Sequence, residues 1–204
     1  MDNIAGVILA GGQSTRMGAG DKCLMSVGGI PLIDRVNSKL SKDLKRILIN
    51  SNAEPHGFSH LDQDIKADVF EGFAGPLAGV LTGMRWAEDI DGTKWIVTAA
   101  ADTPFFPDDY VNRMSKAKQG NRIVLAASNG RKHPVFGIWD ISLADDLETF
   151  LKNGDRKVML FVQKYAHKIE PFDTTGSDPF FNVNTPEDRE TAEKIIMGID
   201  HDGT

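Results

Sequence analysis

The sequence lacks the features that mark secreted, membrane-spanning and nucleic-acid-binding proteins. It contains one cysteine, Cys23, which cannot form an internal disulfide and suits a reducing compartment. No apolar run approaches the roughly 18 residues of a membrane-spanning helix, and the first residues carry no basic signal-peptide start. The formal net charge of −6 argues against a broad nucleic-acid surface. We therefore expect a cytoplasmic protein that contacts neither membrane nor nucleic acid.

The length and composition are those of an ordinary globular domain. With 204 residues, 41% of them hydrophobic, the chain can bury a core that needs no disulfide or metal to fold. It has no internal repeat, low-complexity tract or Pro/Ser-rich linker. We expect one domain over residues 1–197 and a flexible tail at 198–204.

Short apolar runs alternate with segments of helical periodicity over the first 130 residues. The expected strands are 4–10, 47–49, 65–69, 95–101, 123–127 and 135–139. The expected helices are 31–42, 76–87, 107–118, 143–151, 158–165 and a last one capped by Thr185. This alternation predicts an α/β fold with a mostly parallel sheet and helices on both faces. In such sheets, ligands bind beyond the carboxyl ends of the strands.

A glycine-rich loop follows the first expected strand. It reads Leu9-Ala10-Gly11-Gly12-Gln13-Ser14-Thr15-Arg16-Met17-Gly18 and is followed by Asp21-Lys22. Glycines let backbone amides approach an anion, and Arg16 and Lys22 add positive charge. The spacing matches neither the dinucleotide fingerprint nor the Walker loop. Taken alone, the loop fits either a phosphate site or a flexible connection with two surface cations.

The same segment resembles the signature of the nucleoside-triphosphate transferase superfamily. Its Asp-Lys pair is similar to that of the molybdenum cofactor guanylyltransferase family, whereas sugar-phosphate nucleotidyltransferases usually have Pro-Lys there. The resemblance continues in order at residues 49–52, 75–79, 102–104, 154–159 and 182–188. It implies a single-domain, Rossmann-like fold of the nucleotide-diphospho-sugar transferase type.

That family transfers GMP from GTP to the phosphate of molybdenum-carrying molybdopterin and releases pyrophosphate. The resemblance therefore implies a nucleotidyltransferase that makes molybdopterin guanine dinucleotide with Mg²⁺ as its cofactor. It also leads us to expect contacts with molybdenum-cofactor delivery proteins and apo-molybdoenzymes. Three alternatives stay open: a molybdopterin cytidylyltransferase, a sugar-phosphate nucleotidyltransferase, and a GTP-binding delivery protein without turnover.

Matching positions suggest roles for individual residues. The catalytic set is Arg16, Lys22 and Asp102, with Asp102 as the metal ligand, since magnesium takes one or two carboxylates. The GTP-binding set is Leu9, Ala10, Gly11, Gly12, Lys22, Asn50, Asp68, Gly75, Pro76, Leu77 and Asp102. Asn50, Asp68 and Asp102 each have a plainer interpretation as turn or cap residues, and residues 75–79 could be a helix entry and nothing more.

The acceptor side is expected at the end of the chain. Arg156 and Lys157 offer cations for the acceptor phosphate, and Asn182 and Asn184 frame the pterin; the plainer interpretation is a solvated helix start and a cap. His133 is expected near the same opening without a catalytic role.

A phosphate monoester is largely ionised at neutral pH, so the attacking oxygen needs no general base. Catalysis then reduces to positioning and charge neutralisation.

Overall fold

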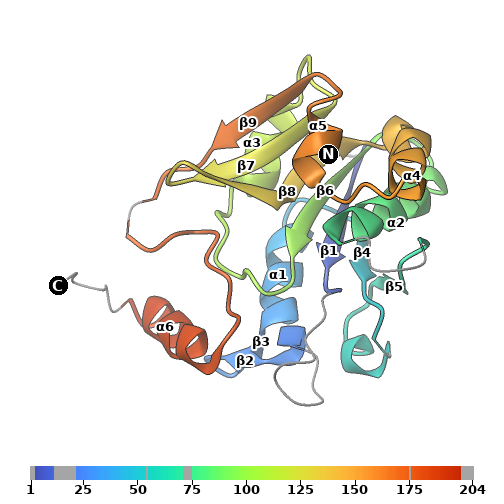
Figure 1. Cartoon of the computed structure of the whole chain (residues 1–204). Coiled ribbons are helices and arrows are strands. Elements are labelled where there is room, and N and C mark those ends of the chain that lie inside the picture. Colours follow the sequence, from blue (N-terminus) through green and yellow to red (C-terminus); the bar gives the residue numbers. More distant parts are fainter. Residues whose placement is uncertain (1–2, 12–21, 54, 71–74, 175, 199–204) are drawn as a thin grey trace.

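A seven-stranded sheet forms the centre of the molecule (Figure 1). The structure is a computed structural model that describes residues 3–11, 22–53, 55–70, 75–174 and 176–198. The sheet has the order β5-β4-β1-β6-β8-β7-β9. Its strands are β1 (Ile4–Leu9), β4 (Ile47–Asn50), β5 (Asp64–Lys66), β6 (Trp95–Ala100), β7 (Ile123–Ser128), β8 (Arg131–Asp140) and β9 (His167–Pro171).

The sheet is mostly parallel, as predicted. β1 pairs in parallel with β4 and β6, β4 with β5, and β7 with β9. Only β8, among the strands of this sheet in the described chain, runs antiparallel to its neighbours, β6 and β7. The sheet therefore has a parallel half and a half organised around the β7–β8 hairpin, and the two halves meet at β6.

Helices cover both faces of the sheet (Figure 1). α1 (Leu32–Ser41) and α3 (Tyr110–Ala117) pack in one core cluster, and α2 (Pro76–Glu88), α4 (Ala144–Lys152) and α5 (Val158–Val162) pack in the other. In α2 the buried apolar residues follow the helical spacing expected from the sequence: Leu77, Val80, Leu81 and Met84. The predicted two-sided covering of the sheet is confirmed.

A smaller layer is built from the β2 (Ser26–Val27) and β3 (Ile30–Pro31) hairpin and α6 (Pro186–Ile196). α6 begins with a capping box, in which Thr185 Oγ1 accepts from the Asp188 amide at 3.1 Å and Asp188 Oδ2 accepts from the Thr185 amide at 2.9 Å. The predicted cap is therefore confirmed. Three 3₁₀ turns complete the described elements: η1 (Lys22–Leu24), η2 (Pro55–Phe58) and η3 (Ile141–Leu143).

Several element boundaries differ from the prediction. The strand expected at 65–69 is β5, and it ends at Lys66. It ends there because the backbone amides of Asp68 and Val69 donate to the side chains of Asn52 and Thr82 and not to a neighbouring strand. The helix expected at 158–165 ends at Val162, and the helix expected at 107–118 begins only at Tyr110. The strand expected at 135–139 extends over all of β8. The β2–β3 hairpin and β9 were not predicted.

The carboxyl ends of β4, β1 and β6 meet at one edge of the sheet. Leu9, the last residue of β1, lies opposite both Asn50 and Ala100. The chain after each of these strands therefore emerges at the same place, where parallel sheets bind ligands. No helix in the described part of the chain is both long and apolar enough to span a bilayer.

Candidate functional site

The end of β1 brings the predicted loop residues to the convergence of three strands. The Ala10 amide donates to the Asn50 carbonyl at 2.9 Å, and the Leu9 carbonyl accepts from the Ala101 amide at 3.1 Å. Leu9 is buried and Gly11 is exposed, so the chain leaves the core within two residues. Of the remaining loop predictions, Gly12 and Arg16, together with the side chain of Lys22, lie outside the described residues.

Asn50 and Asp68 are brought together, as their predicted common role requires. Asn50 Nδ2 donates to Asp68 Oδ1 at 2.9 Å and lies 3.3 Å from the Lys66 carbonyl. Asn52 Nδ2 donates to Asp68 Oδ2 at 2.8 Å, and Asn52 Oδ1 accepts from the Asp68 amide at 2.8 Å. Both carboxylate oxygens are therefore held by amides, which fixes the orientation of the carboxylate. Asn52 belongs to the matching segment 49–52, but it was not singled out from the sequence.

The first turns of α2 close over Asn50. A Cβ at Gly79 would lie 2.3 Å from Asn50 Oδ1 and 2.6 Å from Leu9 Cδ2, so only glycine fits there. At the start of the helix, Gly75 has φ 65°, a conformation that favours glycine, and Pro76 follows at the first helical position. The predicted residues Gly75, Pro76 and Leu77 thus form the N-terminus of a helix whose dipole favours anions.

Asp102 lies just beyond the end of β6. It is half-buried, and its Oδ1 accepts from Thr103 Oγ1 at 3.1 Å. The same hydroxyl lies 2.7 Å from Oδ1 of Asn182, which is 79 residues away in sequence. The Val183 amide donates to the Asp102 carbonyl at 2.8 Å. The structure therefore brings one of the predicted acceptor residues, Asn182, to the predicted metal ligand.

The other predicted acceptor residues lie in different surroundings. Arg156 Nη1 donates to the carbonyls of Leu151 and Asp155 at 2.7 and 2.8 Å, and the guanidinium lies 5.5 Å from the ring centre of Phe70. Lys157 is exposed at the start of α5. Asn184 is exposed, and its backbone amide donates to Asp188 Oδ2 at 2.9 Å in the capping region of α6.

Comparison with known proteins identifies the family. The model of the MobA-like NTP transferase domain matches residues 6–169 of this chain. The chain belongs to that family. The predicted resemblance to the molybdenum cofactor guanylyltransferases is thereby confirmed at the level of family.

Similar proteins extend over nearly the whole chain. A protein from Mesorhizobium japonicum named molybdenum cofactor guanylyltransferase is 42% identical over 205 residues, which cover 97% of this chain and 98% of that protein. A relative of the same name from Rhodopseudomonas palustris (strain HaA2) is 41% identical and covers 94% of this chain and 91% of its own. The solved structure of molybdopterin-guanine dinucleotide biosynthesis protein A from Archaeoglobus fulgidus has a TM-score of 0.75 at 23% identity, covering 95% and 99% of the two chains. This likeness confirms the predicted fold.

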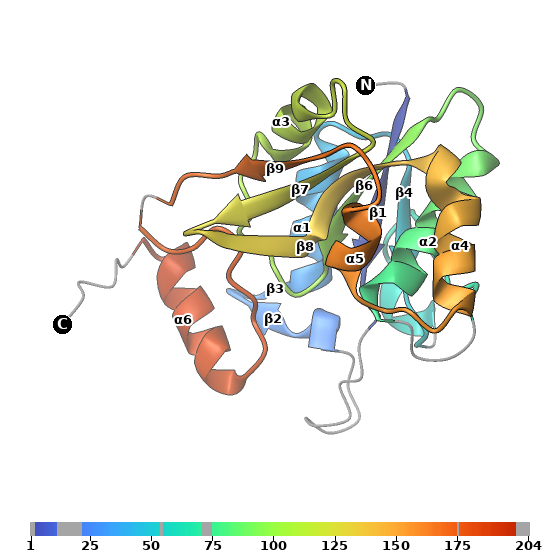
Figure 2. The ribbon, with the colours of Figure 1, turned by 45° about the horizontal axis from the view of Figure 1, so that its top comes forward.

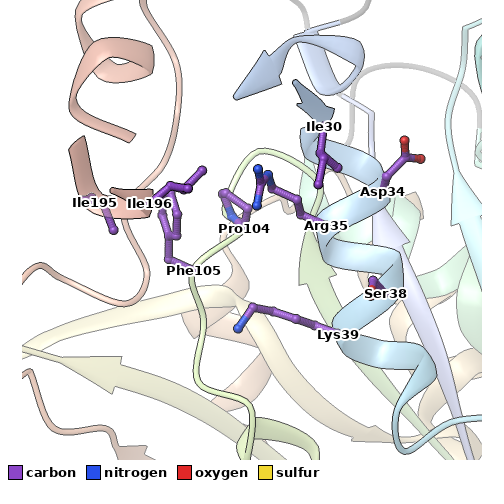
Figure 3. Close-up of a pocket in the computed structure, with 9 residues that line it drawn as sticks. All are labelled: Ile30, Asp34, Arg35, Ser38, Lys39, Pro104, Phe105, Ile195 and Ile196. Carbon is purple, nitrogen blue, oxygen red and sulfur yellow. The ribbon is translucent and has the colours of Figure 1, made fainter. Parts of the chain in front are cut away.

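In this MobA-like chain, Figure 3 shows a cavity of about 520 Å³. It lies between α1, Pro104–Phe105 and α6, and none of the predicted site residues lines it. Its cations have structural partners: Arg35 Nη2 donates to the Val27 carbonyl at 2.6 Å, and Lys39 Nζ donates to the Phe106 carbonyl at 2.8 Å. The Lys39 bond therefore holds the segment that follows Asp102, whereas the Arg35 bond holds β2 against α1.

His133 lies in β8, within a small polar network that the sequence did not reveal. Its Nε2 lies 2.6 Å from Ser128 Oγ, which donates to Asp178 Oδ1 at 2.8 Å. Burial lowers the pKa of His133 below its ordinary value, and the charge of Arg131 adds to this effect while that of Asp178 opposes it. The imidazole is therefore neutral in the folded protein near pH 7.

The close approach of Gly79 to Asn50 yields a first prediction. Gly79→Ala should lower the free energy of unfolding by about 1–3 kcal/mol through overpacking, partly offset by about 1 kcal/mol of helix propensity. It should also displace Asn50 and so weaken GTP binding. Urea unfolding and GTP titration measure the two effects.

Gly83→Ala is the matched control for this change. Its Cβ would lie 2.5 Å from Val7 Cγ2, in the same helix but against the core. We expect a similar loss of stability with GTP affinity unchanged. Equal GTP affinities for both variants would contradict the role of Asn50.

The pKa of His133 yields a second prediction. Since its folded pKa lies below the ordinary 6.5, the unfolded chain binds the proton more tightly. The resulting stability is fully present above about pH 6.5 and is lost as pH falls through the folded pKa. The fall in unfolding free energy between pH 7.5 and 5.5 should therefore be smaller in His133→Gln than in the parent. Equal falls in His133→Gln and the parent would refute the prediction.

Proposed function

We propose that this chain transfers GMP from GTP to the terminal phosphate of molybdenum-carrying molybdopterin and releases pyrophosphate. The observation that carries the proposal is the carboxylate of Asp68, held by Asn50 and Asn52. Both asparagines lie near Gly11, just after β1. A Cβ added at Gly11 would lie 3.9 Å from Asn50 Oδ1 and 3.9 Å from Asn52 Nδ2. A carboxylate with both oxygens oriented retains lone pairs that can accept from the N1–H and 2-amino groups of guanine. The names of the relatives support the same activity.

The phosphate part of GTP is assigned to the loop and to α2. We place it against the backbone at Leu9, Ala10, Gly11 and Gly12, with Arg16 and Lys22 neutralising its charge. The N-terminus of α2, at Gly75, Pro76 and Leu77, adds the positive end of a helix dipole to the same edge. A triphosphate carries several negative charges. Backbone N–H groups, cationic side chains and the positive end of a helix dipole together can neutralise them.

Asp102 fits a divalent metal, which we propose is Mg²⁺. It supplies a hard oxygen ligand at the end of β6, with a hydroxyl and an amide oxygen nearby from Thr103 and Asn182. Within the described ranges there is no cluster of three or more His, Cys, Asp or Glu residues that would cage a metal alone. That suits magnesium, which is commonly held by one or two carboxylates together with substrate phosphates. When bound, the metal neutralises charge that develops on the phosphates.

On the acceptor side, we propose that Asn182 and Asn184 frame the pterin and that Arg156 and Lys157 attract its phosphate. Asn182 has the strongest support, because its amide reaches Thr103 beside Asp102. The acceptor oxygen attacks the α-phosphorus in line with the departing pyrophosphate, so one bond forms as one breaks. The phosphate is already ionised, so the protein needs only to position it and neutralise charge.

Two rival functions lead to different outcomes. A cytidylyltransferase would use the same phosphate chemistry but would not need a carboxylate facing guanine donors, and the names of the relatives do not favour it. A GTP-binding delivery protein would bind nucleotide without turnover. Pyrophosphate release that depends on added molybdopterin separates turnover from simple binding.

Nucleotide selection is the direct test of the base assignment. GTP with magnesium should raise the melting temperature more than ATP or CTP at equal concentration, because a ligand at 100 times its Kd adds about 2.7 kcal/mol to the stability. In Asp68→Asn, which replaces an acceptor oxygen by a donor, the shift with GTP should fall towards that with CTP. Equal shifts for all three nucleotides with the parent protein would remove the guanine assignment.

Asp102→Asn tests the metal assignment. The change is nearly isosteric, so the melting temperature should stay close to that of the parent. Losing the charge that holds the metal should cost several kcal/mol of transition-state stabilisation, or a hundredfold or more in rate at about 1.36 kcal/mol for each factor of ten. The matched control, Asp91→Asn, changes an exposed carboxylate after α2 and should keep full activity. Pyrophosphate release within about threefold of the parent would show that Asp102 is not the principal ligand.

A further inference from the structure

The network of Ser128, His133 and the half-buried Asp178 spans two parts of the chain. Ser128 and His133 are 2% and 8% exposed. A serine hydroxyl has one proton, so when it donates to Asp178 it accepts from the N–H of His133 Nε2. The serine thus lies between the other two groups, and its hydroxyl donates a hydrogen bond to the carboxylate. This order differs from that of a nucleophilic triad, in which histidine takes the serine proton.

The network connects the β7–β8 hairpin to the segment that carries Asn182. Figure 2 shows this segment running from β9 past the tip of the hairpin and down to α6. Asp178 Oδ1 also accepts from the Phe180 amide at 2.9 Å, and the Phe180 ring stacks on His133 with ring centres 4.4 Å apart. Two residues later, Asn182 bonds to Thr103, and the Val183 amide bonds to Asp102.

Apolar packing also attaches this segment to the sheet. Phe180 contacts the rings of Phe136 and Phe172, with centres 4.9 and 5.4 Å apart. Burying a hydroxyl and an imidazole beside a half-buried carboxylate costs desolvation that hydrophobic packing does not. Satisfied buried polar networks specify one geometry, since each bond has a preferred direction. The network therefore adds orientation to a contact that is already stable.

We propose that Ser128 and His133 are positioning residues that orient the segment 178–183 so that Asn182 faces the acceptor beside Asp102. The inference rests on the proposed function, because it takes molybdopterin as the acceptor. Neither residue touches the reacting atoms in this proposal; both act through Asp178 and Phe180. Their loss should affect the acceptor and leave GTP binding unchanged.

Steady-state kinetics with GTP and molybdopterin test this division. Ser128→Ala leaves buried polar groups unsatisfied, so the KM for molybdopterin should rise about tenfold, with the KM for GTP within about twofold of the parent. His133→Phe keeps the ring stack but removes the donor and should behave like Ser128→Ala. His133→Gln keeps an N–H near the position of Nε2 and should restore most of the loss. The control, Thr174→Ala, removes an exposed bond from the same region to Asn129 at the hairpin tip and should match the parent.

Amide hydrogen exchange gives a readout that does not require turnover. The Val183 amide should exchange faster in Ser128→Ala and His133→Phe than in the parent or Thr174→Ala, because its bond to the Asp102 carbonyl is less well oriented. If Val183 exchange and the acceptor KM are both parental in the two variants, the inference is overturned. An equal rise in the two KM values would also overturn it, since the network would then support the whole site. If the parent itself transfers no GMP to molybdopterin, the proposed function fails, while the exchange measurement still decides the positioning role.

Discussion

The buried amide of Asn50 is the constraint on which this site depends. Asn50 is 3% exposed at the end of β4, where an unpaired amide would be costly. The partners that satisfy its N–H groups are Asp68 and the Lys66 carbonyl, so the chain after β5 must return to this point. The other side of the amide needs space, which only glycine at position 79 leaves. One buried polar group thus fixes the end of β4, the loop after β5 and the approach of α2.

How much the sequence predicted depends on whether a feature is local. The apolar run of β1, the helical spacing of α2 and the capping box of α6 depend on neighbouring residues, and all three were predicted correctly. β9 (His167–Pro171) is short and largely polar, and it is a strand because it pairs with β7. β5 ends early because the Asp68 and Val69 amides bond to distant side chains. Such contacts leave no periodic signal in the sequence.

The same distinction applies to the site. Asn50, Asp68 and Asp102 were predicted because they match positions of the family that the sequence resembles, and the structure places the first two in contact. Whether these three residues and the other site residues act as predicted stays a prediction. The partners of these residues were not predicted: Asn52 orients Asp68, and Thr103 links Asp102 to Asn182. Ser128 and Asp178 are 50 residues apart in the sequence. Only the fold therefore reveals that these two residues and His133 form one network.

The position of Asp102 suggests why this sheet suits a reaction with two substrates. β6 is paired in parallel with β1 on one side and antiparallel with β8 on the other. Leu9, Ala10 and Asn50, which we assign to the nucleotide, lie at the carboxyl ends of the parallel half. Asn182 lies in a segment that the β7–β8 hairpin holds through Ser128 and His133. Asp102, just beyond the end of β6, therefore lies between the residues that we assign to the two substrates. In an in-line transfer that needs no general base, this shared border is where positioning and charge neutralisation must coincide.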